Sequence, residues 1–181
     1  KDILHLAYLC EFYGLAEVSD YWSSVVEIND WQNDRFFQKI LIEQFNNLAD
    51  KNIAILGFAF KQDTGDTRDT PAIPLCKKLL AEHANVRIHD PKAIENARID
   101  LKNVKGNFSF FANVYEAVEG VRIIALITHW QEYRELDFVK IYKKMSKPAF
   151  IFDGRNHLDH DKLFEIGFNV FPLGKPSMKH F

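Results

Sequence analysis

The sequence predicts an α/β protein in which a long helix precedes an open, doubly wound parallel sheet. After Asp50, short apolar runs of strand length alternate with helical patterns, which is typical of a parallel sheet covered on both faces. Before Asp50, almost every residue falls in a helical pattern of apolar positions. We therefore expect two parts, a helical region over residues 1–49 and a sheet domain over residues 50–181.

The helical region is expected to contain two helices. Asp2 to Phe12 has apolar residues at near-helical spacing, and Gly14 offers a stop. A second pattern runs from Ala16 to about Leu48 and would span about 45 Å, whereas the ~130 residues that follow would form a globule only about 35 Å across. Because its own domain cannot cover such a helix, we expect a helix-to-helix dimer contact. Alternatively, the apolar side of this helix could pack against a missing domain of the same chain.

The sheet domain is expected to contain six strands with helices between them. The strands are expected at Asn52–Phe60, Val86–His89, Asn107–Phe110, Val121–Ile127, Ala149–Phe152 and Phe168–Phe171. Thr70 is a good helix cap and Pro71 is preorganised for the first helical position, so a helix should run from there to about His83. Further helices are expected near Ala93 and at Tyr115–Glu119, Leu136–Met145 and Lys162–Ile166. The polar tail from Gly174 to Phe181 is expected to fray.

Composition and charge narrow the class of protein. Hydrophobic residues make up 47% of the 181 residues and charged residues 27%, as in folded proteins. The net charge of −2 argues against a nucleic-acid partner whose affinity rests on phosphate neutralisation. No apolar run is long enough to span a bilayer, and the first residues do not resemble a signal peptide, so no membrane partner is expected. The chain begins in the middle of a helical pattern without a Met, as expected of a fragment.

The chain has two cysteines, Cys10 and Cys76. They are too few and too far apart for a disulfide framework or a structural zinc site. Both lie in apolar helical patterns, which predicts buried, reduced thiols. A reducing cytoplasm fits this expectation.

Topology predicts where a ligand should bind. In an open parallel sheet, ligands bind at the carboxyl ends of the strands, near the point where strand order reverses. Lys61 would follow the first strand and Arg155 the fifth, so two cations would share one edge. Such an edge suits a diphosphate, because Arg binds phosphate bidentately and Lys acts as a point charge. The alternative is that both cations are solvated or pair with Asp63, Asp66 or Asp69.

A dinucleotide site is not expected after the first strand. Gly57 stands alone where a G-x-G-x-x-G pattern would be required, and Phe58 and Phe60 would keep a pyrophosphate from the backbone. The sheet is therefore expected to be Rossmann-like without a nicotinamide fingerprint.

Metal binding is not expected either. His157 and His160 have an H-x-x-H spacing but no acidic helix motif around them, and Asp159 is interpreted as a helix cap. The acidic residues at 63, 66 and 69 are interpreted as turn formers rather than a cation site.

Several stretches resemble the UDP-glucose/GDP-mannose dehydrogenase family. They are Lys1-Asp2 followed by ILHLAYLCE, the segment GFAFKQDTGDTR from Gly57 to Arg68, HWQEYRELD and KPAFIFDGR. The similarity continues from residue 1 to about residue 170, and the form of these motifs resembles the UDP-glucose branch. The family's GDP-mannose and UDP-N-acetylmannosamine dehydrogenases share the F-K and R elements. One departure is Gln62, where relatives often carry Lys.

The resemblance implies a three-part, NAD-dependent enzyme. An amino-terminal domain would bind most of the NAD, a long central helix would form a homodimer or a higher oligomer, and a carboxyl-terminal domain would hold the UDP end of UDP-glucose. Two oxidations would yield UDP-glucuronate through a cysteine thiohemiacetal and thioester. That cysteine precedes the Lys-Asp pair by three residues in the family, so this chain lacks it and is expected to be inactive alone.

The resemblance also implies roles for individual residues. Asp2 matches a carboxylate that positions or deprotonates the attacking water. Phe60, Lys61 and Arg155 match residues that hold the UDP-sugar, and Arg68 matches an arginine that reaches the bound NAD. Lys1 matches a lysine beside the active site whose role stays open.

Two other classes of function compete with the enzyme reading. One is a non-catalytic nucleotide-binding or dimerisation module. The other is a response-regulator-like domain, which would use Asp90 and Asp153 as an acidic pocket but would not explain the long helix or the motifs.

Overall fold

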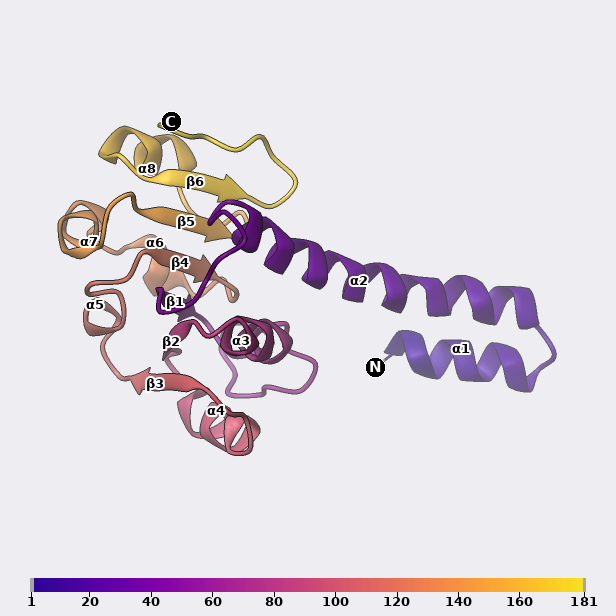
Figure 1. Ribbon diagram of the computed structural model, residues 1–181. Coiled ribbons are helices and arrows are strands. Elements are labelled where there is room, and N and C mark those ends of the chain that lie inside the picture. The colour runs from indigo at the N-terminus through magenta and orange to yellow at the C-terminus, as the bar shows by residue number, and fades with distance from the viewer. Residues whose placement is uncertain (1, 181) are drawn as a thin grey trace. The chain divides into compact units, whose positions relative to one another are not determined.

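The computed structural model describes residues 2–180 and divides into two compact units, one ending at Lys39 and the other beginning at Ile40. The first unit is a pair of antiparallel helices that lie side by side (Figure 1). Helix α1 spans Asp2–Phe12, as predicted, and α2 spans Ala16–Ile42. Ser19 Oγ donates to Ala7 O at 2.8 Å and both residues are buried, so this bond ties the two helices together.

Helix α2 ends at Ile42, and the prediction that it runs to Leu48 is wrong. Phe45 and Asn46 have φ angles of 57° and 55°, and L-residues in this left-handed region cannot continue a right-handed helix. The amide of Asn46 donates to Leu41 O and that of Phe45 to Ile42 O, both at 3.0 Å. These two bonds form a Schellman cap. Glycine is the usual residue at the position of Phe45, so no stop signal for the helix is visible in the sequence here.

The second unit contains one six-stranded sheet in the order β3-β2-β1-β4-β5-β6 (Figure 1). The strands are β1 (Asn52–Leu56), β2 (Asn85–His89), β3 (Asn107–Phe111), β4 (Ile123–Leu126), β5 (Phe150–Asp153) and β6 (Asn169–Pro172). All adjacent strands are parallel. The prediction of a doubly wound parallel sheet is therefore confirmed, and the strand order reverses between β1 and β4.

Helices cover both faces of the sheet. They are α3 (Ala72–Ala81), α4 (Ile94–Leu101), α5 (Val114–Ala117), α6 (Gln131–Arg134), α7 (Phe138–Lys144) and α8 (His160–Ile166). Because parallel crossovers are right-handed, α3 and α4 lie on one face, and the crossovers on the other side of the switch place α7 and α8 on the opposite face (Figure 1). The predicted helices were found within a few residues, but α6 was missed because its four residues show no period.

Strand β1 ends at Leu56, so the prediction that it extends to Phe60 is wrong. Gly57 has φ +91°, which turns the chain out of the sheet. The residues from Gly57 to Phe60 are nonetheless apolar, because Phe58 and Ala59 are fully buried beneath the carboxyl edge. Burial of a loop, rather than of a strand, explains the length of the apolar run.

The carboxyl-terminal tail is held in place as far as His180, which contradicts the expectation of fraying. Met178 forms an antiparallel bridge with Val170, and the Lys179 ammonium lies 2.7 Å from the Glu43 carboxylate. The His180 ring stacks on Phe164 with a centroid distance of 4.0 Å. The tail thus packs along β6 and α8.

Both cysteines are free and buried, as predicted. Burial raises the pKa of Cys76 to about 12, so this thiol is unreactive at neutral pH. Within residues 2–180, no helix is long and apolar enough to cross a membrane.

Candidate functional site

The carboxyl edge of the sheet carries the candidate site, and its first part is the loop after β1. Gly57 opens this loop and lies against Thr128, which follows β4. A Cβ placed on Gly57 would be 2.5 Å from Thr128 Cβ and 2.6 Å from its backbone nitrogen. Only glycine therefore allows the loops after β1 and β4 to approach this closely.

Asp90, directly after β2, organises the loop after β1. Its Oδ2 accepts from the amides of Phe58 at 2.7 Å and Ala59 at 2.9 Å, and from Trp130 Nε1 at 3.0 Å. Its Oδ1 accepts from the amides of Lys92 at 2.8 Å and Ala93 at 2.7 Å. Asp90 is 3% exposed, so one buried carboxylate satisfies five donors from three loops.

This carboxylate also decides whether the loop after β1 fits a dinucleotide. In a dinucleotide-binding sheet, the amides at this turn face a pyrophosphate. Here the Phe58 and Ala59 amides already bind Asp90, and the Phe58 side chain is fully buried. The residues present at this turn do not fit NAD, as the sequence predicted from the missing glycines.

Two contacts join the loops after β1 and β5 to the end of β4. Thr128 Oγ1 donates to Ala59 O at 2.5 Å, next to Phe60 and Lys61. Arg155 Nε donates to Ile127 O at 2.6 Å. Because Ile127 and Thr128 are adjacent, the Phe60–Lys61 segment and Arg155 flank one short stretch at the switch point of the sheet.

Phe60, Lys61 and Arg155 present their side chains at this edge in different ways. Phe60 is 47% exposed, and Lys61 is exposed. Arg155 is also exposed as a residue, but its guanidinium is closely surrounded, and this loss of hydration lowers the pKa of Arg155 from its ordinary value. An arginine stays cationic at neutral pH despite such a shift. The edge therefore offers an aromatic face and two cations.

Asp153 organises the loop that carries Arg155. This fully buried residue at the end of β5 accepts from the amides of Arg155, His157 and Leu158, each at 2.9 Å. His160 Nε2 lies 2.9 Å from the same carboxylate. Asp153 thus shapes the Arg155 loop as Asp90 shapes the loop after β1.

His129 adds little positive charge to the edge. The rings of His129 and His157 meet edge-on with centroids 6.0 Å apart. Burial, together with the charges of Arg155 and His157, lowers the pKa of His129. His129 is therefore mainly neutral at pH 7, and Lys61 and Arg155 supply positive charge to the edge.

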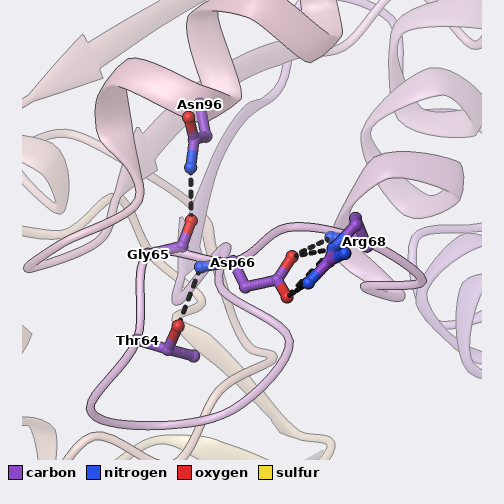
Figure 2. Close-up of polar contacts among 5 residues, drawn as sticks. All are labelled: Thr64, Gly65, Asp66, Arg68 and Asn96. Atoms are coloured by element: carbon purple, nitrogen blue, oxygen red, sulfur yellow. Dashed lines mark hydrogen bonds and ion pairs between the residues drawn. The ribbon is translucent and has the colours of Figure 1, made fainter.

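A second loop segment, residues 64–68, carries Arg68 (Figure 2). The Asp66 carboxylate accepts from Arg68 Nε at 2.9 Å and from Nη2 at 2.6 Å. The hydrogen bond and charge of Asp66 raise the pKa of Arg68. Asn96, on α4, fixes the segment by donating to Gly65 O at 2.6 Å. Arg68 remains 78% exposed, so its guanidinium is oriented but accessible.

The remaining predicted site residues belong to the helical unit. Asp2 is the first residue of α1 and is exposed, whereas Lys1 lies outside the described residues. The two units are separate compact bodies. The structure brings together Phe60, Lys61 and Arg155 but gives no arrangement of Asp2 with them.

No group of three or more metal-ligating side chains occurs in the described part of the chain. His157 Nε2 contacts Trp130 O at 3.0 Å, and His160 contacts Asp153. Asp159 accepts from the Lys162 amide and caps α8, as the sequence predicted.

The loop-organising roles of Asp90, Asp153 and Thr128 were not predicted from the sequence. All three directly follow or end an apolar strand, at the edge where ligands bind. A carboxylate at that place, followed by Pro91 in one case and Gly154 in the other, is the signal that could have identified the two aspartates. Their partners are backbone amides distant in sequence, which no local pattern reveals.

Comparison with known proteins gives matches over most of the chain. Residues 54–160 match the model of the UDP-binding domain of the UDP-glucose/GDP-mannose dehydrogenase family. UDP-glucose 6-dehydrogenase 1 of Glycine max is 45% identical over 97% of this chain and 40% of its own length. UDP-glucose 6-dehydrogenase 3 of Arabidopsis thaliana gives the same identity and coverage. The chain thus spans about two fifths of the curated relatives it matches.

Solved structures share the fold. A UDP-glucose dehydrogenase from Pyrobaculum islandicum superposes with a TM-score of 0.71 at 24% identity, over 92% of this chain and 36% of its own. An NDP-N-acetyl-D-galactosaminuronic acid dehydrogenase from Methanosarcina mazei Go1 gives a TM-score of 0.66 at 23% identity, over 94% and 33% respectively. At these identities the likeness concerns the fold alone.

Proposed function

The chain belongs to the UDP-glucose/GDP-mannose dehydrogenase family, and on this premise we propose that it is the UDP-sugar-binding part of a UDP-glucose 6-dehydrogenase. The whole protein would oxidise UDP-glucose to UDP-glucuronate, with NAD as hydride acceptor. The observation that carries the proposal is the carboxyl edge, where Phe60, Lys61 and Arg155 flank the end of β4. The 45% identity to plant UDP-glucose 6-dehydrogenases favours UDP-glucose over GDP-mannose and UDP-N-acetylmannosamine.

In this proposal, the residues of this chain bind and orient the substrate. Arg155 can donate two parallel hydrogen bonds to a phosphate, and Lys61 supplies a second positive charge. The bond from Arg155 Nε to Ile127 O holds one side of the guanidinium at the sheet edge. Phe60 offers an exposed ring at the same edge.

We assign NAD mainly to a domain outside this chain, because the turn after β1 does not fit a dinucleotide. Arg68 is proposed to reach that NAD, and the pair with Asp66 would orient it. Asp2 is proposed to act as a base toward the attacking water. Two buried free thiols are consistent with a reducing compartment, which we propose to be the cytoplasm.

Arg155→Ala in the full-length protein is expected to lower kcat/KM for UDP-glucose about ten- to hundredfold. The reason is that a charge-assisted hydrogen bond to phosphate contributes about 1.5–3 kcal/mol. NADH formation with UDP-glucose, GDP-mannose and UDP-N-acetylmannosamine measures this. Two NADH per UDP-glucose are expected, and the 181-residue chain alone should form none.

Arg98→Ala is the matched control, because Arg98 is an exposed arginine on α4 that pairs with Glu95. It should leave kcat/KM unchanged. A preference for another sugar nucleotide would move the assignment to a sibling enzyme. No activity with any of the three would leave only a nucleotide-binding module.

We also propose that residues 1–49 form the dimerisation region. Helices α1 and α2 and the turn between them expose large apolar side chains, namely Leu4, Tyr8, Phe12, Tyr13, Tyr21, Ile28 and Trp31, each more than half exposed. An apolar surface of this extent is typical of a protein interface.

The chain is expected to have the mass of a dimer in light scattering. The double variant Ile28→Glu with Trp31→Glu should give monomers, because burying two carboxylates in an apolar interface is unfavourable. Ile99→Glu is the matched control, since Ile99 is 61% exposed but lies on α4. A monomeric wild-type chain with intact helicity would contradict the proposal.

A further inference from the structure

A groove of about 720 Å³ lies at the amino edge of the sheet, opposite the candidate site. Its lining comes from the starts of β4, β5 and β6, from the turn after α2, from α7 and from the carboxyl-terminal tail. The lining residues are Phe45, Arg122, Tyr142, Lys147, Phe150 and His180 with three small or polar neighbours. All of these residues belong to the second unit. A volume of this size is typical of small-molecule sites.

The groove is positively charged. No acidic side chain is found among the described residues that line it. Arg122 donates from Nε to Gln44 Oε1 at 3.0 Å and from Nη1 to Lys147 O at 3.4 Å, so its described partners are neutral. Lys147 Nζ likewise contacts the carbonyls of Tyr142 and Met145.

A third cation strengthens this field. Lys51 Nζ donates to Gln44 O at 3.2 Å, and the side chain of the same Gln44 accepts from Arg122. Burial, and next the charge of Arg122, lower the pKa of Lys51. Glu43 is an acidic residue next to Gln44 in the sequence, and its carboxylate pairs with the Lys179 ammonium. A concentration of cations in a chain of net charge −2 favours an anionic ligand.

The groove also presents aromatic faces. Phe45 is 87% exposed, although it is a large apolar residue. It occupies the left-handed cap position of α2 with φ 57°, where glycine would fit without strain. Backbone strain of this kind concentrates at ligand-binding positions. Tyr142 is held across the groove, where its hydroxyl packs against Gly167 and the Lys147 ammonium lies 3.6 Å from its ring centroid.

We propose that this groove binds a small aromatic anion of the nucleoside monophosphate class, with its ring against Phe45 and its phosphate at Arg122 and Lys147. The exposed ring of Phe45 fits the base of such a ligand, and Arg122 and Lys147, whose described partners are not carboxylates, fit its phosphate. The site is independent of the UDP-sugar site, because it lies at the other edge of the sheet.

The test uses AMP as the probe, with adenosine and inorganic phosphate in parallel, in calorimetric titrations of the 181-residue chain. AMP should bind one-to-one with a Kd below about 1 mM, and adenosine and phosphate each at least about tenfold more weakly. Phe45→Asn removes the ring, while Asn tolerates the left-handed backbone. Phe45→Asn should lower the affinity for AMP at least about fivefold and leave the affinity for phosphate unchanged. Lys147→Met should lower both affinities about tenfold.

Phe60→Asn is the matched control, because it removes an exposed phenylalanine from the opposite edge and should not change AMP affinity. Binding of UDP-glucose should persist in Phe45→Asn, so failure of the two sites can be distinguished. Circular dichroism and thermal unfolding establish that each variant folds.

Three results would overturn the proposal. The first is no saturable AMP binding up to about 5 mM. The second is AMP binding that is lost in Phe60→Asn and kept in Phe45→Asn, which would place the probe at the carboxyl edge. The third is a dimer that dissociates in Phe45→Asn without AMP binding to either form, which would make the groove a contact between copies of this chain.

Discussion

Asp90→Ala is expected to lower the free energy of unfolding by about 3–5 kcal/mol and to abolish binding at the carboxyl edge. The substitution leaves four backbone amides and the Trp130 indole N–H without the acceptor they share, and each buried unsatisfied donor is costly. The loop after β1, which carries Phe60 and Lys61, would lose the bonds that fix its course. Urea denaturation measures the first effect and UDP-glucose titration the second.

Asp90→Asn keeps the size of the side chain but replaces one of its two acceptor oxygens with an NH₂ donor, so it tests whether both acceptors are needed for stability. One orientation of the amide places its NH₂ against the Phe58 and Ala59 amides, and the other places it against those of Lys92 and Ala93. Both orientations oppose donors with donors, so asparagine should recover little of the lost stability. Asp161→Ala, at an exposed residue in the first turn of α8, is the control and should change stability by about 0.5 kcal/mol or less. A stable Asp90→Asn variant would show that the carboxylate is dispensable.

Gly57→Ala is expected to destabilise the protein by about 2–4 kcal/mol, from overpacking against Thr128 and from the positive φ. The added Cβ would overlap a backbone nitrogen at 2.6 Å, which no rotamer change relieves. To make room, the loops after β1 and β4 would have to separate, and UDP-glucose affinity should fall with stability.

Gly120→Ala isolates the steric part of this effect. Gly120 has φ +70°, but a Cβ there would meet nothing within 4 Å. Its substitution should cost only the backbone strain, about 1–2 kcal/mol, and should leave UDP-glucose affinity unchanged. Equal destabilisation by the two substitutions, measured by urea denaturation, would refute the close approach of Gly57 to Thr128.

The candidate site could be predicted in part because, in a parallel sheet, the residues that follow the strands lie together at one edge. Apolar runs located the strands, and the rule for parallel sheets then put Lys61 and Arg155 at one edge. The roles of individual residues came from the resemblance of motifs such as GFAFKQDTGDTR. The contacts of Asp90 with residues 30 or more positions away along the chain lay beyond either argument, because hydrogen bonds of that sequence separation leave no periodic signal.

The sequence by itself determined the class of fold, the six strands, the helical beginning and the absence of a dinucleotide fingerprint. These depend on local periodicity and on glycine spacing, which can be read without knowing what packs against what. Only the tertiary structure decided that α2 ends at a strained Phe45, that the tail is held against β6, and that buried Asp90 and Asp153 shape the two loops of the site. Each of these depends on contacts between segments far apart in the chain, whose free energy exceeds the local preferences that the sequence displays.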